Sequence, residues 1–294
     1  MTAMPLTPLP RTMLEPMIRR ALDEDLGLAG DVTSAAVIPP DHQSEVVASA
    51  RQPGCIAGLD CAELACALVD PSITVTRHVN DGDSVSRGTE IATLQGPSRS
   101  LLIAERTALN FMGHLSGIAS VTSDLVRRVE GTHASIACTR KTTPGLRALE
   151  KYAVRAGGGM NHRYSLSDAV LIKDNHIAIA GGVGPALTSA KQTVGHMVKI
   201  EIEVDTLAQL EQVLEIGADA VLLDNMTPAT LREAVGMIDG RAIAEASGGI
   251  TPDTVRVVAE TGVDLISMGW ITHSAPCLDI GLDFVASYPK KHWS

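Results

Sequence analysis

Short apolar runs recur along the second half of the chain, and each has the length of a β-strand with helix-like sequence before the next. The runs are residues 134–139, 169–173, 198–204, 220–224, 241–246 and 264–269. The last four begin about 22 residues apart, which is the length of one strand, one helix and two loops. Repeats of this kind predict a parallel sheet with right-handed crossover connections.

Six strands are two fewer than a closed eight-stranded barrel requires. We therefore expect an incomplete, six-stranded α/β barrel, and a doubly wound sheet is the alternative. Ligands bind at the C-terminal ends of the strands in both architectures. Polar residues that directly follow the six runs are therefore candidates for a binding site.

The first half of the chain has a different texture. Residues 13–26 alternate apolar and charged positions at helical spacing, and strand-like runs follow at 45–50, 55–60, 73–79 and 90–94. Apolar residues at every third or fourth position predict one or two helices over 100–130, which would link this part to the barrel. Residues 281–288 are expected to return to the first domain. The expected domains are thus 1–115 with 276–294, and a barrel of 116–275.

Composition excludes several classes of protein. A formal net charge of -10 and an aromatic content of 2% argue against general nucleic-acid binding, which favours basic faces and stacking rings. No apolar run approaches the ~20 residues of a membrane span, and the N-terminus lacks the pattern of a secretory signal. The five cysteines include no CxxC pair, so we expect reduced thiols in a cytoplasmic protein.

Positive charge gathers between residues 139 and 176, against the acidic balance of the whole chain. Arg140 and Lys141 follow the first strand of the predicted barrel, and Lys173 closes the second. Cations at these strand ends predict a local site for a small anion. Arg147, Lys151 and Arg155 instead recur every four residues beside Glu150, and this spacing predicts a solvated stripe on a helix.

His162 and Arg163 follow three consecutive glycines, residues 157–159. Glycines in such a row allow a sharp turn or a close approach of the backbone to a ligand. We interpret His162 and Arg163 as site residues, and a structural turn histidine is the alternative for His162.

Carboxylates follow the next two strands. Glu201 and Glu203 alternate with isoleucines and therefore share one face of their strand, which in a barrel is the interior. An inward carboxylate is costly unless it meets a metal or a cation. Glu203 is nearest the end of its strand, and Asp224 ends the next one. Beside a polyphosphate these two would suit Mg²⁺, held through water or substrate oxygens. Salt bridges to Lys141 and Lys173 are the alternative, and both can hold together.

Glycine-rich sequence follows the last two strands. Ser247, Gly248 and Gly249 come after the fifth run and Gly269 after the sixth, each where we expect a helix to begin. Backbone N–H groups at such a helix start bind phosphate, and the last two strands of an α/β barrel are the usual place for it.

Taken together, these motifs resemble those of the quinolinate phosphoribosyltransferases, which decarboxylate quinolinate and make nicotinate mononucleotide in NAD biosynthesis. The resemblance covers nearly the whole chain and rests on EDLG, TRKTTPGLRALEKYAVRAGGGMNHR, LIKDNH, EIEVD, LLDN and EASGG. It implies an N-terminal α/β sandwich domain with an incomplete α/β barrel, an obligate homodimer, and the substrates quinolinate and phosphoribosyl pyrophosphate. The products would be nicotinate mononucleotide, pyrophosphate and CO₂.

The resemblance also implies roles for individual residues. The quinolinate carboxylates and the pyrophosphate would meet Arg140, Lys141, His162, Arg163 and Lys173. The ribose hydroxyls and Mg²⁺ would lie near Glu203 and Asp224, which with Lys141 are the expected catalytic residues. The 5-phosphate would be held by Ser247, Gly248, Gly249 and Gly269. Arg106 would be contributed to the neighbouring subunit's active site. Trp270 and Ile271 depart from the family pattern beside the phosphate loop.

Three other functions remain open from the sequence. A transferase of the same fold could act on another acceptor. A Schiff-base lyase could use Lys173 at the end of a barrel strand. A noncatalytic phosphate-binding barrel would need the glycine loops but not the carboxylates. Because Arg140 stands beside Lys141, an anion site is favoured over a nucleophilic lysine.

Overall fold

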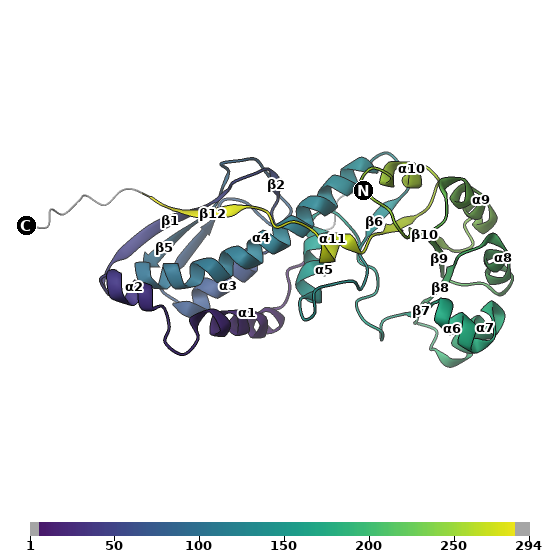
Figure 1. Cartoon of the computed structure of the whole chain (residues 1–294), viewed down its shortest axis with the longest axis horizontal. Helices are drawn as coiled ribbons and strands as arrows, with labels where there is room; N and C mark the ends of the chain where they lie inside the picture. The colour runs from purple at the N-terminus through teal and green to yellow at the C-terminus, as the bar shows by residue number, and fades with distance from the viewer. Residues whose placement is uncertain (1–5, 286–294) are drawn as a thin grey trace, which may run out of the picture. The chain divides into compact units, whose positions relative to one another are not determined.

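The structure is a computed structural model that describes residues 6–285, which form two compact units (Figure 1). The second unit is Val121–Ser274, and the first consists of the described residues on either side of it. The chain therefore returns to its first unit, as expected for residues 281–288. The last three of those residues lie outside the described part.

The first unit contains a four-stranded antiparallel sheet with the order β12-β1-β5-β3. Its strands are β1 (Gln43–Ala50), β3 (Thr74–Arg77), β5 (Glu90–Pro97) and β12 (Ile280–Phe284). A short ribbon pairs β2 (Gly54–Cys55) with β4 (Ser84–Val85). The returning strand β12 pairs with β1, so the first and last parts of this unit share one sheet.

Helices cover this sheet. They are α1 (Arg11–Leu26), α2 (Val32–Val37), α3 (Leu59–Val69) and α4 (Ser98–Arg128). A small cavity is lined by Ala48 and Leu94 of the sheet together with Cys66 of α3 and Met112 of α4, so these two helices pack on the sheet. This helix layer on a sheet is the expected α/β sandwich.

One predicted strand of the first unit is wrong. Of residues 55–60 only Cys55 lies in a strand, and α3 begins at Leu59. The carboxylate of Asp81 accepts hydrogen bonds from the backbone N–H groups of Gly58 and Leu59, at 3.1 and 3.2 Å, and so satisfies the first turn of the helix. This cap comes from a residue far along the chain, so the local sequence did not reveal it.

The second unit is built on six parallel strands with the order β6-β11-β10-β9-β8-β7. They are β6 (Ser135–Ala137), β7 (Val170–Ile172), β8 (Ile200–Val204), β9 (Ala220–Asp224), β10 (Ile243–Ser247) and β11 (Leu265–Ser267). Each coincides with one of the six predicted runs, and only β10 extends one residue beyond its run. From β7 to β11 the neighbours follow chain order, and β6 pairs with β11. Within residues 6–285, no pairing joins β6 to β7. A doubly wound sheet would have strands on both sides of its first strand, whereas β6 lies at the edge of this sheet. The expected incomplete barrel is therefore confirmed.

Seven helices accompany the strands of this unit in the part of the chain that the structure describes. They are α5 (Arg147–Ala156), α6 (Asp174–Ala180), α7 (Val183–Thr193), α8 (Leu207–Ile216), α9 (Pro228–Ile238), α10 (Val255–Ala259) and α11 (Trp270–His273). In Figure 1, α6 to α9 lie outside the curved row of strands. The side chains of Thr206 and Gln209 form a reciprocal cap at the N-terminus of α8. This cap fixes where the preceding loop ends and the helix begins.

The segment after the three glycines lies along the open edge of the barrel. Met160 N donates to Ile136 O at 2.7 Å, and Cys138 N donates to Met160 O at 3.1 Å, so this segment extends the sheet beside β6. A Cβ atom on Gly159 would lie 2.7 Å from Thr122 Cγ2, which explains why glycine is required here. Approach to a ligand, as interpreted from the sequence, stays a prediction, and the close approach seen here is to the side chains of Thr122 and Val154. It serves to bring His162 and Arg163 to the barrel.

The predicted solvated stripe on α5 is wrong. Lys151 is 2% exposed and Glu150 is fully buried, while Arg147 and Arg155 are half-buried. The Lys151 ammonium donates to Cys138 Sγ at 3.0 Å, and Glu150 accepts from the backbone N–H of Thr143 at 3.0 Å. The spacing of charges matched a surface helix, but α5 is covered on nearly all sides.

Two features bear on the cellular setting. The five cysteines are all free, and four of them are buried. None of the helices in residues 6–285 is long and apolar enough to span a membrane.

Candidate active site

A cavity of about 700 Å³ opens at the C-terminal ends of the barrel strands. Eleven of the twelve site residues predicted from the sequence line it: Arg140, Lys141, His162, Arg163, Lys173, Glu203, Asp224, Ser247, Gly248, Gly249 and Gly269. They come from all six strand ends and from the segment beside β6, which the barrel brings together. The twelfth, Arg106, lies on α4 in the first unit and is exposed.

Two arginines leave hydrogen-bonding capacity unused in the cavity wall. The Nε atoms of Arg140 and Arg163 are buried and have no hydrogen-bond partner among the described residues. Burial lowers the pKa of Arg163, and the nearby charge of Arg140 lowers it further. Two guanidinium groups that repel each other and retain free donors would be stabilised by a bound anion.

Glu203, near the end of β8, and Asp224, at the end of β9, have different partners. Lys173 Nζ forms an ion pair with Glu203 Oε2, which is one of the salt bridges considered from the sequence. Asp224 accepts a hydrogen bond from the side chain of Asn225 at 2.6 Å. Burial raises the pKa of Asp224, as do the charges of Glu203 and Asp205. The carboxylates thus repel each other across a shared space, where a cation would be favourable.

The glycine loops pack closely against their neighbours. Gly248 has a φ of +93°, and a Cβ atom there would lie 2.2 Å from Asn225 Oδ1. A Cβ atom on Gly269 would lie 2.6 Å from Lys141 Cδ. Only glycine therefore lets the loop after β10 pack against the one after β9, and the loop after β11 against the one after β6.

One expected helix start is displaced. The loop of Ser247, Gly248 and Gly249 does not lead directly into a helix, because α10 begins only at Val255. Both glycines have left-handed φ angles, +93° and +59°, which cannot continue into a right-handed helix. After Gly269, the helix α11 does begin at once, at Trp270.

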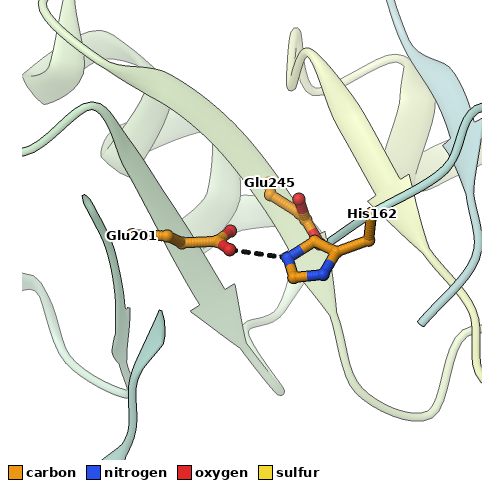
Figure 2. A group of neighbouring side chains, drawn as sticks. All are labelled: His162, Glu201 and Glu245. Carbon is orange, nitrogen blue, oxygen red and sulfur yellow. Dashed lines mark hydrogen bonds and ion pairs between the residues drawn. The ribbon is translucent and has the colours of Figure 1, made fainter. Parts of the chain in front are cut away.

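A buried group of three titratable side chains lies at the cavity and contains a residue that the sequence analysis missed. Figure 2 shows His162, Glu201 and Glu245 converging from different segments. His162 Nε2 and Glu201 Oε2 are 2.6 Å apart. Glu245, on β10, is 2% exposed and lines the cavity with His162. Its signal in the sequence was a charge between two apolar residues of a strand, alanines for Glu245 and isoleucines for Glu201.

Burial and like charge alter the titration of this group. Burial raises the pKa of Glu245 to about 7, with the charge of Glu201 adding to the effect. Burial alone would lower the pKa of His162, but the hydrogen bond to Glu201 and the charges of both glutamates outweigh it and raise that pKa. The imidazole is therefore stabilised in its protonated form.

Known protein families match both parts of the chain. Residues 31–116 match the family described as quinolinate phosphoribosyl transferase, N-terminal domain, and residues 118–283 match the C-terminal domain of the same family.

Individual relatives agree with this match. The chain is 45% identical over 271 residues to the nicotinate-nucleotide pyrophosphorylase [carboxylating] of Mycobacterium leprae, covering 90% of this chain and 95% of the relative. It is 44% identical to a decarboxylating quinolinate phosphoribosyltransferase of Nicotiana tabacum, covering 92% and 81%. The solved nicotinate-nucleotide pyrophosphorylase of Francisella tularensis is 37% identical with a TM-score of 0.91, covering 95% and 99%.

These matches extend over both units and confirm the enzyme class that the motifs indicated. The Francisella structure has the same fold over nearly the whole chain, so the cavity belongs to an architecture that its relatives share. The chain belongs to the quinolinate phosphoribosyltransferase family.

Proposed function

We propose that the barrel cavity transfers the phosphoribosyl group of phosphoribosyl pyrophosphate to quinolinate, with decarboxylation, in NAD biosynthesis. The observation that carries the proposal is the convergence of four cations, Arg140, Lys141, Arg163 and Lys173, with two carboxylates in one cavity. Both substrates are polyanions, and their encounter requires fixed positive charge.

Arg140 and Arg163 are the proposed partners of the quinolinate carboxylates. The planar fork of a guanidinium donates to both oxygens of a carboxylate, which a lysine cannot match. Their unpartnered Nε atoms support this role, because these donors need an acceptor that the described protein residues do not supply. His162 lies on the same cavity wall and adds a further cation.

Lys141, Lys173 and the glycine loops are the proposed partners of the donor. The two lysines would bind the pyrophosphate, while Ser247 to Gly249 and Gly269 would hold the 5-phosphate. The contact between Lys141 and Gly269 supports this assignment, since it puts an ammonium side chain against the phosphate loop.

Glu203 and Asp224 are proposed to stabilise the charge that develops during transfer. The bond from the ribose carbon to pyrophosphate breaks with its electron pair leaving on the pyrophosphate, and the ring nitrogen supplies the pair for the new bond. The ribose carbon carries positive charge between these events, as in glycosyl transfer generally, and a nearby carboxylate lowers its energy. CO₂ then departs, and a proton replaces it on the ring carbon.

Mg²⁺ fits the same two carboxylates. Their mutual repulsion favours a cation between them, and two protein ligands suit an ion that keeps several waters and shares phosphate oxygens. Bound there, Mg²⁺ would neutralise part of the charge on the donor's pyrophosphate.

A homodimer completes the proposal. Arg106 is exposed on α4 and has no hydrogen-bond or ion-pair partner within residues 6–285, so its guanidinium is available to a neighbouring subunit. The free thiols support the cytoplasm as the working compartment.

A turnover assay tests the proposed function. Purified protein with quinolinate, phosphoribosyl pyrophosphate and Mg²⁺ should release CO₂ and form nicotinate mononucleotide, and a chelator should stop the reaction. Nicotinate as the sole acceptor should give no product, which separates this enzyme from a transferase with another acceptor. Borohydride should trap no adduct on Lys173. Absence of turnover with quinolinate would refute the proposal.

A further inference from the structure

We infer that Glu245 is a positioning residue: as a neutral carboxylic acid in the cavity wall, it keeps the His162–Glu201 ion pair balanced so that the anionic acceptor can bind. Ionisation of Glu245 would add an unbalanced negative charge and weaken that binding. The inference rests on the proposed function, because it concerns the acceptor's carboxylates.

The geometry joins the three side chains into one unit. One ring nitrogen of His162 and one carboxylate oxygen from each glutamate all lie within 4.8 Å of one another. Glu201 is 8% exposed and Glu245 is 2% exposed, and the Oε1 atom of each has no hydrogen-bond partner. Two buried carboxylates at this separation, each with one unsatisfied oxygen, are costly when both are ionised.

The strands on either side of Glu245 contribute an apolar and a neutral polar side chain. The neighbouring β9 contributes apolar Leu222, which is in register with Glu245, and β7 contributes apolar Leu171 opposite Glu201. On the other side, β11 contributes the hydroxyl of Ser267, which partly counteracts the raised pKa of Glu245.

The cations near the group face its other two members. The charge of Lys151 from α5 acts on His162, and Arg163 interacts with both Glu201 and Arg140. No cation donates directly to Glu245 among the hydrogen bonds and ion pairs of the described residues. Because Glu201 is paired with His162 and no cation donates to Glu245, we assign the proton to Glu245.

The balance of charge follows from this assignment. Imidazolium, carboxylate and neutral carboxylic acid sum to zero, and loss of the Glu245 proton leaves one negative charge. The pKa of Glu245, at about 7, puts this change near neutral pH. His162 lines the cavity, and its Nε2 is already bonded to Glu201, so Nδ1 is the nitrogen left to face the acceptor.

The arrangement of His162, Glu201 and Glu245 favours a bound proton over a metal ion. The 2.6 Å hydrogen bond to Glu201 occupies Nε2 of His162, one of the two ring nitrogens that a metal could use. The neighbouring Lys151 and Arg163 would also repel a divalent cation. We therefore expect quinolinate to bind with uptake of a proton above pH 7.

Calorimetry measures this uptake directly. Quinolinate is titrated into the enzyme at pH 8 in two buffers of different ionisation enthalpy, which gives the number of protons bound per site. The wild type should take up a substantial fraction of one proton, and Glu245→Gln close to none. Glu260→Gln, an exposed carboxylate paired with Arg256, is the matched control and should behave as the wild type.

Kinetics give a second measurement. Above pH 7, the wild-type KM for quinolinate should rise towards ~10-fold per pH unit, while kcat changes less. In Glu245→Gln, the KM should be flat over the same range. A purely structural role would lower activity by the same factor at all pH values.

Three results would overturn the inference. One is the absence of proton uptake by the wild type at pH 8, which does not depend on any variant folding. Another is a Glu245→Gln enzyme with the wild-type pH profile. The third is tight binding of Zn²⁺ to chelator-treated wild type that is lost in Glu245→Gln. A wild type without turnover would instead refute the proposed function itself.

Discussion

The ammonium of Lys151 donates a hydrogen bond to the backbone carbonyl of His162 across 2.9 Å. Lys151 is on α5, and His162 is on the segment that lies along the open edge of β6. The bond is largely shielded from water, since Lys151 is only 2% exposed. It therefore fixes the backbone from which His162 reaches the cavity.

Replacing this lysine should loosen the site. Lys151→Met leaves the His162 carbonyl without its donor, and an unsatisfied buried acceptor costs about 1–3 kcal/mol. We expect a lower melting temperature and a higher KM for quinolinate. Lys191→Met is the matched control, because Lys191 also donates to a backbone carbonyl, that of Ile216, but at an exposed position. Equal effects of the two variants would show that the Lys151 bond has no special role.

The phosphate loop should not tolerate a side chain at Gly248. Gly248→Ala combines a φ of +93° with a Cβ atom 2.2 Å from Asn225 Oδ1, so Asn225 must move. The KM for phosphoribosyl pyrophosphate should rise by at least ~10-fold, a loss of about 1.4 kcal/mol in binding. Gly240→Ala has the same backbone strain, with a φ of +70° and nothing within 4 Å. It should leave this KM unchanged.

Loss of the Glu203 carboxylate should slow turnover. Glu203→Ala removes a charge proposed to stabilise the transition state and to hold Mg²⁺, and should lower kcat by at least ~10-fold. The Mg²⁺ concentration for half-maximal activity should also rise. Glu211→Ala, on the exposed face of α8, is the control. Unchanged kcat in Glu203→Ala would favour a noncatalytic role for this carboxylate.

Mixing two inactive variants tests the proposed dimer. Arg106→Ala and Lys141→Ala should each abolish activity without unfolding the protein. A mixed dimer would contain one intact site if Arg106 serves the neighbouring subunit, so activity should partly return after mixing. Lys141→Ala mixed with Glu203→Ala should gain no activity over the two variants measured separately, because both changes lie in the same cavity. No recovery in the first mixture would mean that Arg106 acts within its own subunit or not at all.

Stability should depend on pH through Glu245. Its pKa is raised from 4.5 to about 7, so between these values the folded protein keeps a proton that the unfolded chain releases. The free energy of unfolding therefore falls as pH rises through this window, by on the order of 3 kcal/mol at most. Glu245→Gln does not titrate and should gain in melting temperature relative to the wild type from pH 5 to pH 7. Parallel melting curves across this range would contradict the raised pKa.

Most of the barrel could be predicted from the sequence. All six strands coincide with the apolar runs to within one residue, because a strand buried between a core and surrounding helices needs local apolar sequence. Eleven predicted site residues line one cavity for a related reason. The ends of parallel strands meet at one edge of a sheet, so residues that follow them converge whatever their separation along the chain.

The failures share a different cause. The spacing of Lys151 is typical of a surface helix, but its ammonium is buried against Cys138, which precedes the helix. Leu59 lies in a strand-like run, but its backbone N–H is capped by Asp81, which is distant in sequence. Glu245 was a single charge between alanines, with nothing nearby to indicate a partner.

The sequence by itself determined the order of the elements, the family and the residues at the strand ends, because local apolar patterns and motifs carry that information. Only the tertiary structure decided which charges are buried and what they face. Burial and partnership depend on the distance between side chains, and the fold brings His162, Glu201 and Glu245 together from three separate segments.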